Sequence, residues 1–158
     1  MRYSQIRKQD ISNGDGIGVA LFVQGCSFHC HNCFNQNTWD FEGGKEWTDN
    51  EKQLIFKLSE KEYITRLSIL GGEPLHSTNI VEITDLIKEY KTLFPKNKIW
   101  VWTGFSFEDI KNLELMDYID YLIDGRYKDE LRDLTLKYRG SSNQNVYKRE
   151  NDKWIKII

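Results

Sequence analysis

All three cysteines of this chain lie close together, at Cys26, Cys30 and Cys33, with the spacing Cys-x3-Cys-x2-Cys. No fourth cysteine exists among the 158 residues. A [4Fe–4S] cluster has four irons and normally binds four thiolates. Three thiolates would leave one iron open to another ligand. The spacing therefore predicts a loop that curls until three sulfurs face one cluster.

Two other chemistries fit a loop of this kind. The cysteines could bind zinc in a closed tetrahedral site, with His29 or His31 as the fourth ligand. They could also form a redox pair with a spare thiol. The spacing favours the cluster, and residues elsewhere in the chain strengthen that interpretation.

Length and charge exclude several classes of protein. A chain of 158 residues predicts one domain, spanning 1–158. The net charge of −2 gives no electrostatic case for binding nucleic acid or a membrane. No run of about 18 apolar residues is present, and the N-terminus has no signal-peptide pattern. We therefore expect a cytoplasmic protein, where thiols stay reduced and clustered cysteines bind metal.

Strand and helix patterns alternate along the chain. The apolar residues 17–24 predict a buried strand that runs directly into the cysteines. Further strands are expected at 66–70, 98–102 and 118–123, and an edge strand at 3–8. Helices are expected from Asp49 or Asn50 to about 60, from Ser77 or Thr78 to Pro95, and from Ser106 to about 113. Alternation around residues 146–157 predicts a C-terminal hairpin.

This order predicts an α/β fold with mostly parallel strands and right-handed crossovers. Four or five such strands cannot close a barrel of eight, so the sheet should stay open. Each strand ends in a distinctive loop, and parallel strands place those loops at one edge. The loops are the cysteine triad, Gly71-Gly72-Glu73-Pro74, Thr103-Gly104-Phe105 and Asp124-Gly125-Arg126-Tyr127.

The triad followed by Gly71-Gly72-Glu73-Pro74 resembles the radical S-adenosylmethionine (radical SAM) enzymes. The resemblance implies an open partial (β/α) barrel, a [4Fe–4S] cluster on the three cysteines and S-adenosylmethionine on the open iron. Gly71, Gly72 and Glu73 would then face the methionine end of the cofactor. Glycines let a backbone approach a ligand closely, and its carbonyls accept hydrogen bonds from an ammonium group.

Three further positions are candidates for contact with S-adenosylmethionine. Thr103 and Asp124 end successive strands and would face a ribose hydroxyl or a bound cation. Asn32 stands where many family members have an aromatic residue that packs near the adenine. Its backbone is a candidate adenine contact, with Phe28 and Phe34 as alternatives for the packing.

The chain is similar to one branch of that superfamily, the activating proteins of anaerobic ribonucleoside-triphosphate reductases. The similarity rests on the triad and on a set of short motifs: Asn13-Gly14, Gly25-Cys26, Thr38-Trp39, Gly71 to His76, Trp100 to Gly104, Asp124-Gly125 and Arg139 to Gln144. It implies reductive cleavage of S-adenosylmethionine and a glycyl radical on a separate large reductase subunit. It also implies an electron donor of the flavodoxin or ferredoxin type. No catalytic side chain is expected, because cluster and cofactor carry the radical chemistry.

Two alternatives stay open. The pyruvate formate-lyase activating enzymes share residues like Thr38-Trp39-Asp40, but their chains are considerably longer. A docking subunit with structural zinc is the second. The small size favours an activator, because a truncated barrel leaves a lateral opening for a peptide loop of a large protein.

Overall fold

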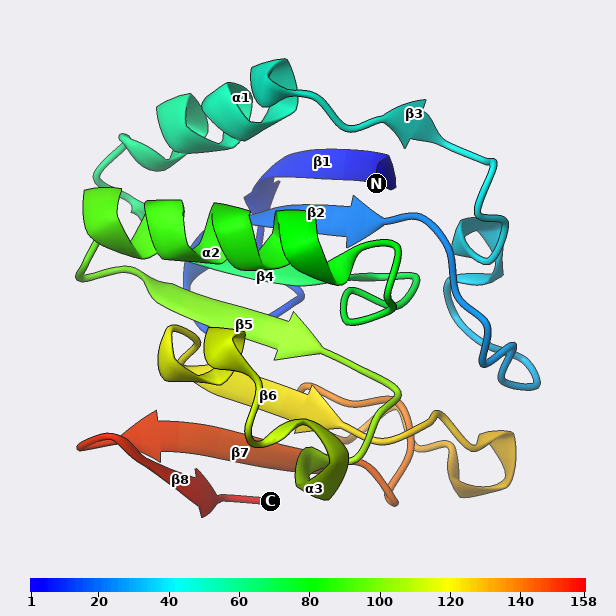
Figure 1. Ribbon diagram of the computed structural model, residues 1–158. Coiled ribbons are helices and arrows are strands. Elements are labelled where there is room, and N and C mark those ends of the chain that lie inside the picture. The colour runs from blue at the N-terminus through cyan, green and yellow to red at the C-terminus, as the bar shows by residue number, and fades with distance from the viewer.

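The computed structural model describes residues 1–158, which form one open eight-stranded sheet flanked by helices (Figure 1). The strand order is β3-β1-β2-β4-β5-β6-β7-β8. The strands are β1 (Arg2–Asp10), β2 (Ile17–Val23), β3 (Lys45–Glu46), β4 (Ile64–Gly71), β5 (Lys98–Trp102), β6 (Tyr121–Asp124), β7 (Asn145–Glu150) and β8 (Lys153–Lys156). The helices are α1 (Asp49–Ser59), α2 (Ile80–Leu93) and α3 (Phe107–Ile110), with short 3₁₀ turns η1 (Gln36–Thr38), η2 (Glu114–Asp117) and η3 (Asp129–Leu131).

The centre of the sheet is parallel and its flanks are antiparallel. Strands β2, β4, β5 and β6 pair in parallel, joined by crossovers through α1, α2 and α3. The remaining pairs are antiparallel. The expected α/β class and open sheet are confirmed, but "mostly parallel" holds only for the four central strands. For β1–β2 and β7–β8 the reason is the short connection, which can join only antiparallel neighbours; β3 and β7 pair antiparallel with β1 and β6 through longer connections.

The expected C-terminal hairpin is present as β7 and β8. Asn151 and Asp152 connect the two strands, with φ angles of 51° and 62°. Positive φ at both central residues is the signature of the hairpin turn that matches strand twist, and Asn and Asp tolerate it.

Two helix starts differ from the expected ones. Thr48 caps α1, through a capping box with Glu51, so the cap precedes Asp49 and Asn50. Asn79 precedes α2, and its side chain donates instead to the carbonyls of Gln24 and Glu73. Asn79 is buried and ties α2 to the strand-end loops. Long-range partners therefore replaced local capping at this position.

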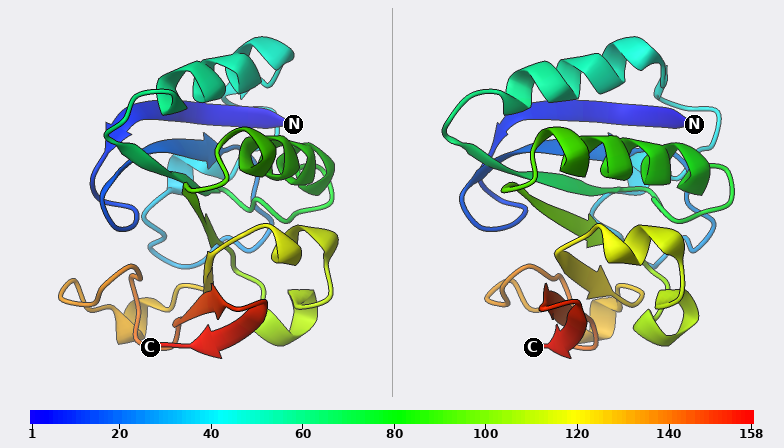
Figure 2. Two further views of the ribbon diagram at one scale, coloured as in Figure 1. Left: turned by 90° about the vertical axis from the view of Figure 1, so that its left-hand side faces the viewer. Right: turned by 60° about the vertical axis from the view of Figure 1, so that its left-hand side comes forward.

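The helices cover one face of the sheet only. Figure 2 shows α1, α2 and α3 on one side, and the loops that follow β1 and β6 on the other. The main core lies between the helices and the sheet, and its fully buried side chains include Leu21, Ile69, Leu86 and Val101. Burying large apolar side chains on this scale is the main source of stability in a domain of this size.

The opposite face is covered by loops and contains a buried ion pair. Arg66 is 1% exposed and its guanidinium contacts the Asp10 carboxylate at 3.0 Å. The same guanidinium donates to the carbonyls of Asp10, Asp15 and Gly16, and to the Ser68 hydroxyl. These bonds fix the 10–16 loop against the sheet. Burial lowers the pKa of Arg66, and Asp10 opposes that effect.

Aromatic residues complete the loop-covered face. Trp100 is 1% exposed and stacks on Tyr121, with ring centroids 3.9 Å apart. Trp102 and Tyr138 pack against the same cluster. This face is therefore ordered without any helix.

The two edges of the sheet are short and charged. Strand β3 consists of Lys45 and Glu46 alone, and both are exposed. Strand β8 begins and ends with exposed lysines, Lys153 and Lys156. None of the helices is both long and apolar enough to span a membrane.

Candidate functional site

A cavity of about 450 Å³ opens at the carboxyl ends of the parallel strands and continues onto the loop-covered face. A volume of this size suits a small-molecule ligand. Every strand-end loop contributes to it. The lining includes Cys26, Cys30, Cys33, Gly71, Gly72, Glu73, Thr103, Gly104, Gly125, Trp39, Phe22, Leu70, Trp102, Tyr138, Arg7, Arg126 and Arg139.

The three cysteines are free, half-buried and directed to this one cavity. Burial raises the pKa of Cys26, while backbone N–H groups of Phe28 and His29 counteract it. Burial also raises the pKa of Cys30. Thiols in such surroundings need positive charge or a metal to deprotonate them.

Positive φ angles produce the curl of the cysteine loop. His29 has φ 48° and Asn32 has φ 56°, so each reverses the chain between two cysteines. Asn is one of the few non-glycine residues that tolerate this conformation. The backbone therefore explains why position 32 carries Asn rather than an aromatic residue.

The Asn32 side chain turns away from the cavity and donates to Asp129 Oδ2 at 2.9 Å. Asn32 does not line the cavity, whereas Phe28 and Phe34 do. Both rings make cation–π contacts. The guanidinium carbon of Arg126 lies 4.5 Å from the centroid of the Phe28 ring, and that of Arg132 lies 5.3 Å from the centroid of the Phe34 ring. Of the three candidates for adenine packing, the structure brings only the two phenylalanines to the cavity.

The Gly71-Gly72 turn is packed against the start of the cysteine loop. Gly72 N–H donates to Val23 O at 2.9 Å, and Glu73 N–H donates to Gly25 O at 2.8 Å. A Cβ on Gly72 would lie 2.5 Å from the Gly25 carbonyl oxygen. Only glycine fits at this position, so the two loops form one rigid unit.

Glu73 is 2% exposed and locks the ends of β4 and β5 together. Its carboxylate accepts from the Thr103 hydroxyl at 2.5 Å, from Gly104 N–H at 2.8 Å and from Leu75 N–H at 3.2 Å. Burial raises the pKa of Glu73 to about 7, against the effect of these donors. Glu73 and Thr103 both line the cavity, but their polar groups are directed at each other.

Asp124 does not reach the cavity. Its carboxylate is buried and accepts from Phe107 N–H at 2.8 Å and from the Asn145 backbone and side chain at 3.1 and 3.0 Å. It thereby caps the start of α3 and fixes β7. The geometry gives Asp124 a structural role, and the neighbouring Gly125 is the residue that lines the cavity.

The 139–144 segment has a clear structural function that the sequence did not reveal. Gln144 Oε1 accepts from Gly140 N–H and Ser141 N–H, while its Nε2 donates to Gly125 O at 3.0 Å. The buried Ser141 hydroxyl accepts from Lys128 N–H. The segment therefore holds the loop after β6 in place beside the cysteines.

Three arginines line the cavity, and Glu73 is the only acidic residue among its lining residues. Arg139 Nε is buried and has no hydrogen-bond partner. Arg7 lies over the Phe22 ring at 4.5 Å. The lining is therefore positively charged, which suits an anionic group such as a thiolate-bound cluster. The sequence indicated Arg139 only as part of a motif, and nothing in it indicated Arg7.

The donor set fits a cluster better than a single metal ion. His29 stacks on Trp39 at 4.5 Å, and His31 is exposed. A zinc site needs four donors around one centre. Three half-buried thiols around one cavity match a larger, cube-shaped group.

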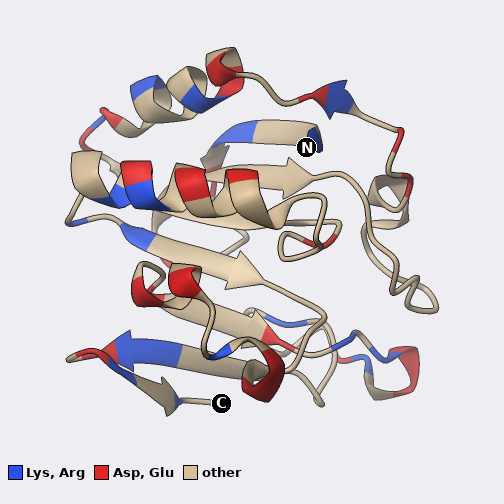
Figure 3. Ribbon diagram, viewed as in Figure 1, with Lys and Arg blue, Asp and Glu red and all other residues tan.

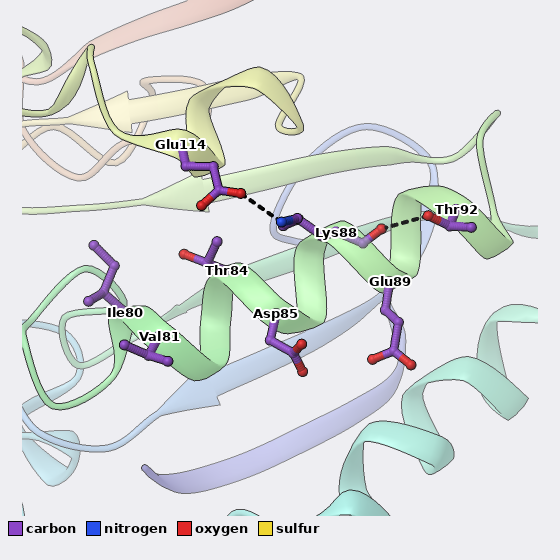
Figure 4. A pocket seen from close by; sticks show the side chains of 8 residues that line it. All are labelled: Ile80, Val81, Thr84, Asp85, Lys88, Glu89, Thr92 and Glu114. Atoms are coloured by element: carbon purple, nitrogen blue, oxygen red, sulfur yellow. Dashed lines mark hydrogen bonds and ion pairs between the residues drawn. The ribbon is translucent and has the colours of Figure 1, made fainter.

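A second hollow, of about 540 Å³, lies on the outer surface of α2 (Figure 4). It is lined mainly by polar and charged residues, and Lys88 pairs with Glu114 across it at 2.6 Å. It contains no cysteine. Figure 3 marks acidic and basic residues along α2, and this hollow has no group of thiols comparable to that of the first cavity.

Known proteins resemble this chain over almost its whole length. A family model described as a 4Fe-4S single cluster domain matches residues 12–147. The anaerobic ribonucleoside-triphosphate reductase-activating protein of Enterobacteria phage T4 is 43% identical over 155 residues, which covers 98% of each chain. The proteins of the same name from Escherichia coli (strain K12) and Vibrio cholerae are each 36% identical, over 93% and 94% of this chain and 98% of theirs.

Proposed function

This chain belongs to the family of anaerobic ribonucleoside-triphosphate reductase-activating proteins, and on that premise we propose how it acts. Cys26, Cys30 and Cys33 hold one [4Fe–4S] cluster, and the cavity beside them binds S-adenosylmethionine. The product is a glycyl radical on the large reductase subunit. The open sheet then corresponds to a partial barrel of the radical SAM type.

The observation that carries this proposal is the shared cavity. Three free thiols, the Gly71-Gly72 turn and the positively charged lining meet in one volume of about 450 Å³. Gly104 is part of the same cradle, because a Cβ there would lie 2.5 Å from the Phe28 ring. Segments that lie far apart in the sequence thus meet around the three thiols.

When bound, the cluster would supply one electron and S-adenosylmethionine the deoxyadenosyl carbon, with breakage of its C–S bond and release of methionine, so that hydrogen could be removed from a glycine Cα. The side chains of this chain do the rest without acid or base catalysis. The rigid unit of Gly72 and Gly25 positions the cofactor, and the positively charged lining offsets the negative charge of three thiolates. Phe28 and Phe34 exclude water from the site.

The loop-covered face gives a partner access to the cavity. The helices lie over the other face, whereas on this face residues of the 10–16 loop and of the segment after β6 are among those that line the cavity (Figure 2). A large protein can insert a peptide loop from this side. An electron donor of the flavodoxin or ferredoxin type would supply the reducing equivalent.

Anaerobic reconstitution tests the proposal. The chain is given iron, sulfide, S-adenosylmethionine and a reductant, and 5′-deoxyadenosine is measured. Purified reductase or, in a parallel sample, pyruvate formate-lyase is then added, and electron paramagnetic resonance is recorded. We expect a brown protein, 5′-deoxyadenosine and a glycyl doublet. Bound zinc without acid-labile sulfide would contradict the cluster, and a doublet on pyruvate formate-lyase alone would contradict the partner.

Gly72 provides a sharper test of the cofactor site. Gly72→Val should weaken S-adenosylmethionine binding and also lower cluster content, because the new side chain collides with Gly25 at the start of the cysteine loop. Gly125→Ala is a comparison at another glycine of the lining. Its φ is 90° and its Cβ would meet nothing closer than 3.8 Å, so it adds backbone strain without collision. Equal affinity in wild type and Gly72→Val would exclude this turn from the site.

A further inference from the structure

The cysteine loop makes few hydrogen bonds of its own. Within residues 27–33 the only backbone-to-backbone bond runs from Cys33 N–H to Cys30 O, at 3.1 Å. His29 and Asn32 nevertheless hold positive φ angles of 48° and 56°. A non-glycine residue keeps such a conformation only where its surroundings impose it. Contacts from elsewhere in the molecule therefore fix this loop.

The segment after β6 supplies such contacts. Asn32 Nδ2 donates to Asp129 Oδ2 at 2.9 Å, across a separation of 97 residues. The ring centroids of Phe34 and Tyr127 lie 4.9 Å apart, so a second contact joins the same two segments. In Figure 1 both segments lie at the end of the sheet where the parallel strands finish. The bond to Asp129 thus holds the turn between the second and third cysteines from outside the loop.

Asp129 is itself held in place. Its other carboxylate oxygen accepts from the Tyr127 hydroxyl at 2.8 Å. One residue earlier, Lys128 N–H donates to the buried Ser141 hydroxyl at 3.1 Å. A carboxylate with both oxygens engaged has little freedom to turn, so Asp129 presents a fixed acceptor to Asn32.

We propose that Asp129 is a positioning residue for the metal centre, an inference that rests on the cluster of the proposed function. By holding Asn32 in the left-handed conformation, it keeps Cys30 and Cys33 directed at the same cavity before any iron is bound. Asp129 is not among the residues that line that cavity, so it acts through Asn32. Outer partners of this kind orient metal ligands, and their removal typically changes metal affinity about 10–100-fold.

Cluster retention tests the proposal. The reconstituted chain is mixed anaerobically with an iron chelator, and the loss of cluster absorbance is followed in wild type, Asp129→Ala, Asn32→Gly and the double variant. Glycine accepts a φ of 56° without strain, so Asn32→Gly removes the hydrogen bond and spares the turn. We expect iron release to accelerate about tenfold in each single variant. The double variant should be no faster than Asn32→Gly, because the same contact is lost in all three.

Two further variants are the controls. Asp129→Asn retains an acceptor oxygen for Asn32 and should stay close to wild type. Glu130→Ala removes the exposed carboxylate of the next residue and should leave iron release unchanged. An equal acceleration in Glu130→Ala would show that only the charge of this segment matters, and it would overturn the proposal. So would an effect of Asp129→Ala that persists in full in the Asn32→Gly background.

A second measurement uses the cluster-free chain and separates loop position from overall stability. The Cys33 N–H, which is bonded to Cys30 O, should exchange faster in Asp129→Ala, while exchange in α2 and the urea midpoint stay as in wild type. Unchanged exchange at Cys33 would contradict the positioning role. Faster exchange, together with a wild-type chain that binds no iron–sulfur cluster, would contradict the proposed function and leave the positioning of the cysteines by Asp129 supported.

Discussion

The two faces of the sheet are built on different principles. The helix-covered face is an apolar core in which side chains such as Leu86 and Ile69 are fully buried. The loop-covered face uses a buried ion pair, stacked aromatic rings and hydrogen bonds from the Arg66 guanidinium. Apolar burial is non-directional, while ion pairs and hydrogen bonds fix positions. The first face therefore provides stability, and the second provides geometry for the cavity.

The largest effect should come from the cysteines, which lie at the carboxyl ends of the parallel strands, in the cavity that continues onto the second face. Cys26→Ser, Cys30→Ser and Cys33→Ser should each lose iron and abolish S-adenosylmethionine cleavage. Because all three side chains are half-buried, the free energy of unfolding of the cluster-free chain should change by less than about 1 kcal/mol. Iron analysis, 5′-deoxyadenosine assays and urea unfolding check this.

The matched changes are Ser27→Ala in the same loop and Leu86→Ala on the helix-covered face. Ser27→Ala should behave like wild type. Leu86→Ala should lower the free energy of unfolding by about 2–5 kcal/mol yet retain iron binding. If a variant kept full cleavage activity, the cysteine substituted in it would not be a ligand of the cluster.

Arg66 should be an exception to this division between the two faces, because it lies on the loop-covered face and yet contributes to the free energy of unfolding. Arg66→Met removes the buried partner of the Asp10 carboxylate and leaves it only the longer contact with Arg7, at 3.5 Å, and the donors of Asn13, which should cost about 3–5 kcal/mol in urea unfolding. Thr65→Ala, at an exposed position of the same strand, is the control. Adding Asp10→Asn should restore part of the loss. A cost below about 1 kcal/mol would mean that water enters this pair.

Glu73 predicts a pH dependence of stability. Its pKa is raised from 4.5 to about 7 in the folded chain, so protonated Glu73 favours folding. That contribution is complete below pH 4.5 and is lost as pH rises through about 7, by up to about 3 kcal/mol. Relative to Glu73→Gln, wild type should therefore lose stability between pH 5 and pH 8. The exposed Glu42→Gln should show no such difference, and an opposite slope would mean that the three donors outweigh burial.

The smallest effect should come from residues 132–140, here called the strap, which contacts Trp102 and Asp15 through Tyr138. Tyr138→Phe removes the hydrogen bond to Asp15 and should cost about 0.5–1.5 kcal/mol. Amide exchange should increase in the strap and in the 10–16 loop but not in α2. Tyr118→Phe, on the helix-covered side, is the control. Unchanged exchange in both loops would mean that the strap is fixed by Trp102 alone.

Sequence patterns predicted the features that depend on local order. Strand β5 begins and ends where expected, and the rule for parallel strands brought Gly72, Glu73 and Thr103 together with the cysteines. The direction in which a side chain points was harder to predict from the sequence. Asp124 ends its strand as expected, but partners at Phe107 and Asn145 turn it away from the cavity.

Long-range pairs account for the other differences. Asp10 and Arg66 are 56 residues apart, and no periodic pattern links them. The role of Gln144 depends on the loop around Gly125, which the sequence only marks as a turn. The parallel centre was predictable because helical crossovers between strands require parallel pairing. The antiparallel flanks were harder to predict, because their strands have only a weak pattern of alternating apolar and polar residues.

The charged margins of the sheet have a consequence for solubility. An open sheet exposes unpaired backbone at both ends, and such edges recruit strands from other molecules into aggregates. Here one margin is only Lys45 and Glu46, and the other begins and ends with Lys153 and Lys156. Charges on short edge strands oppose edge-to-edge association. The chain can thus keep its sheet open beside the cavity without forming fibres through its free edges.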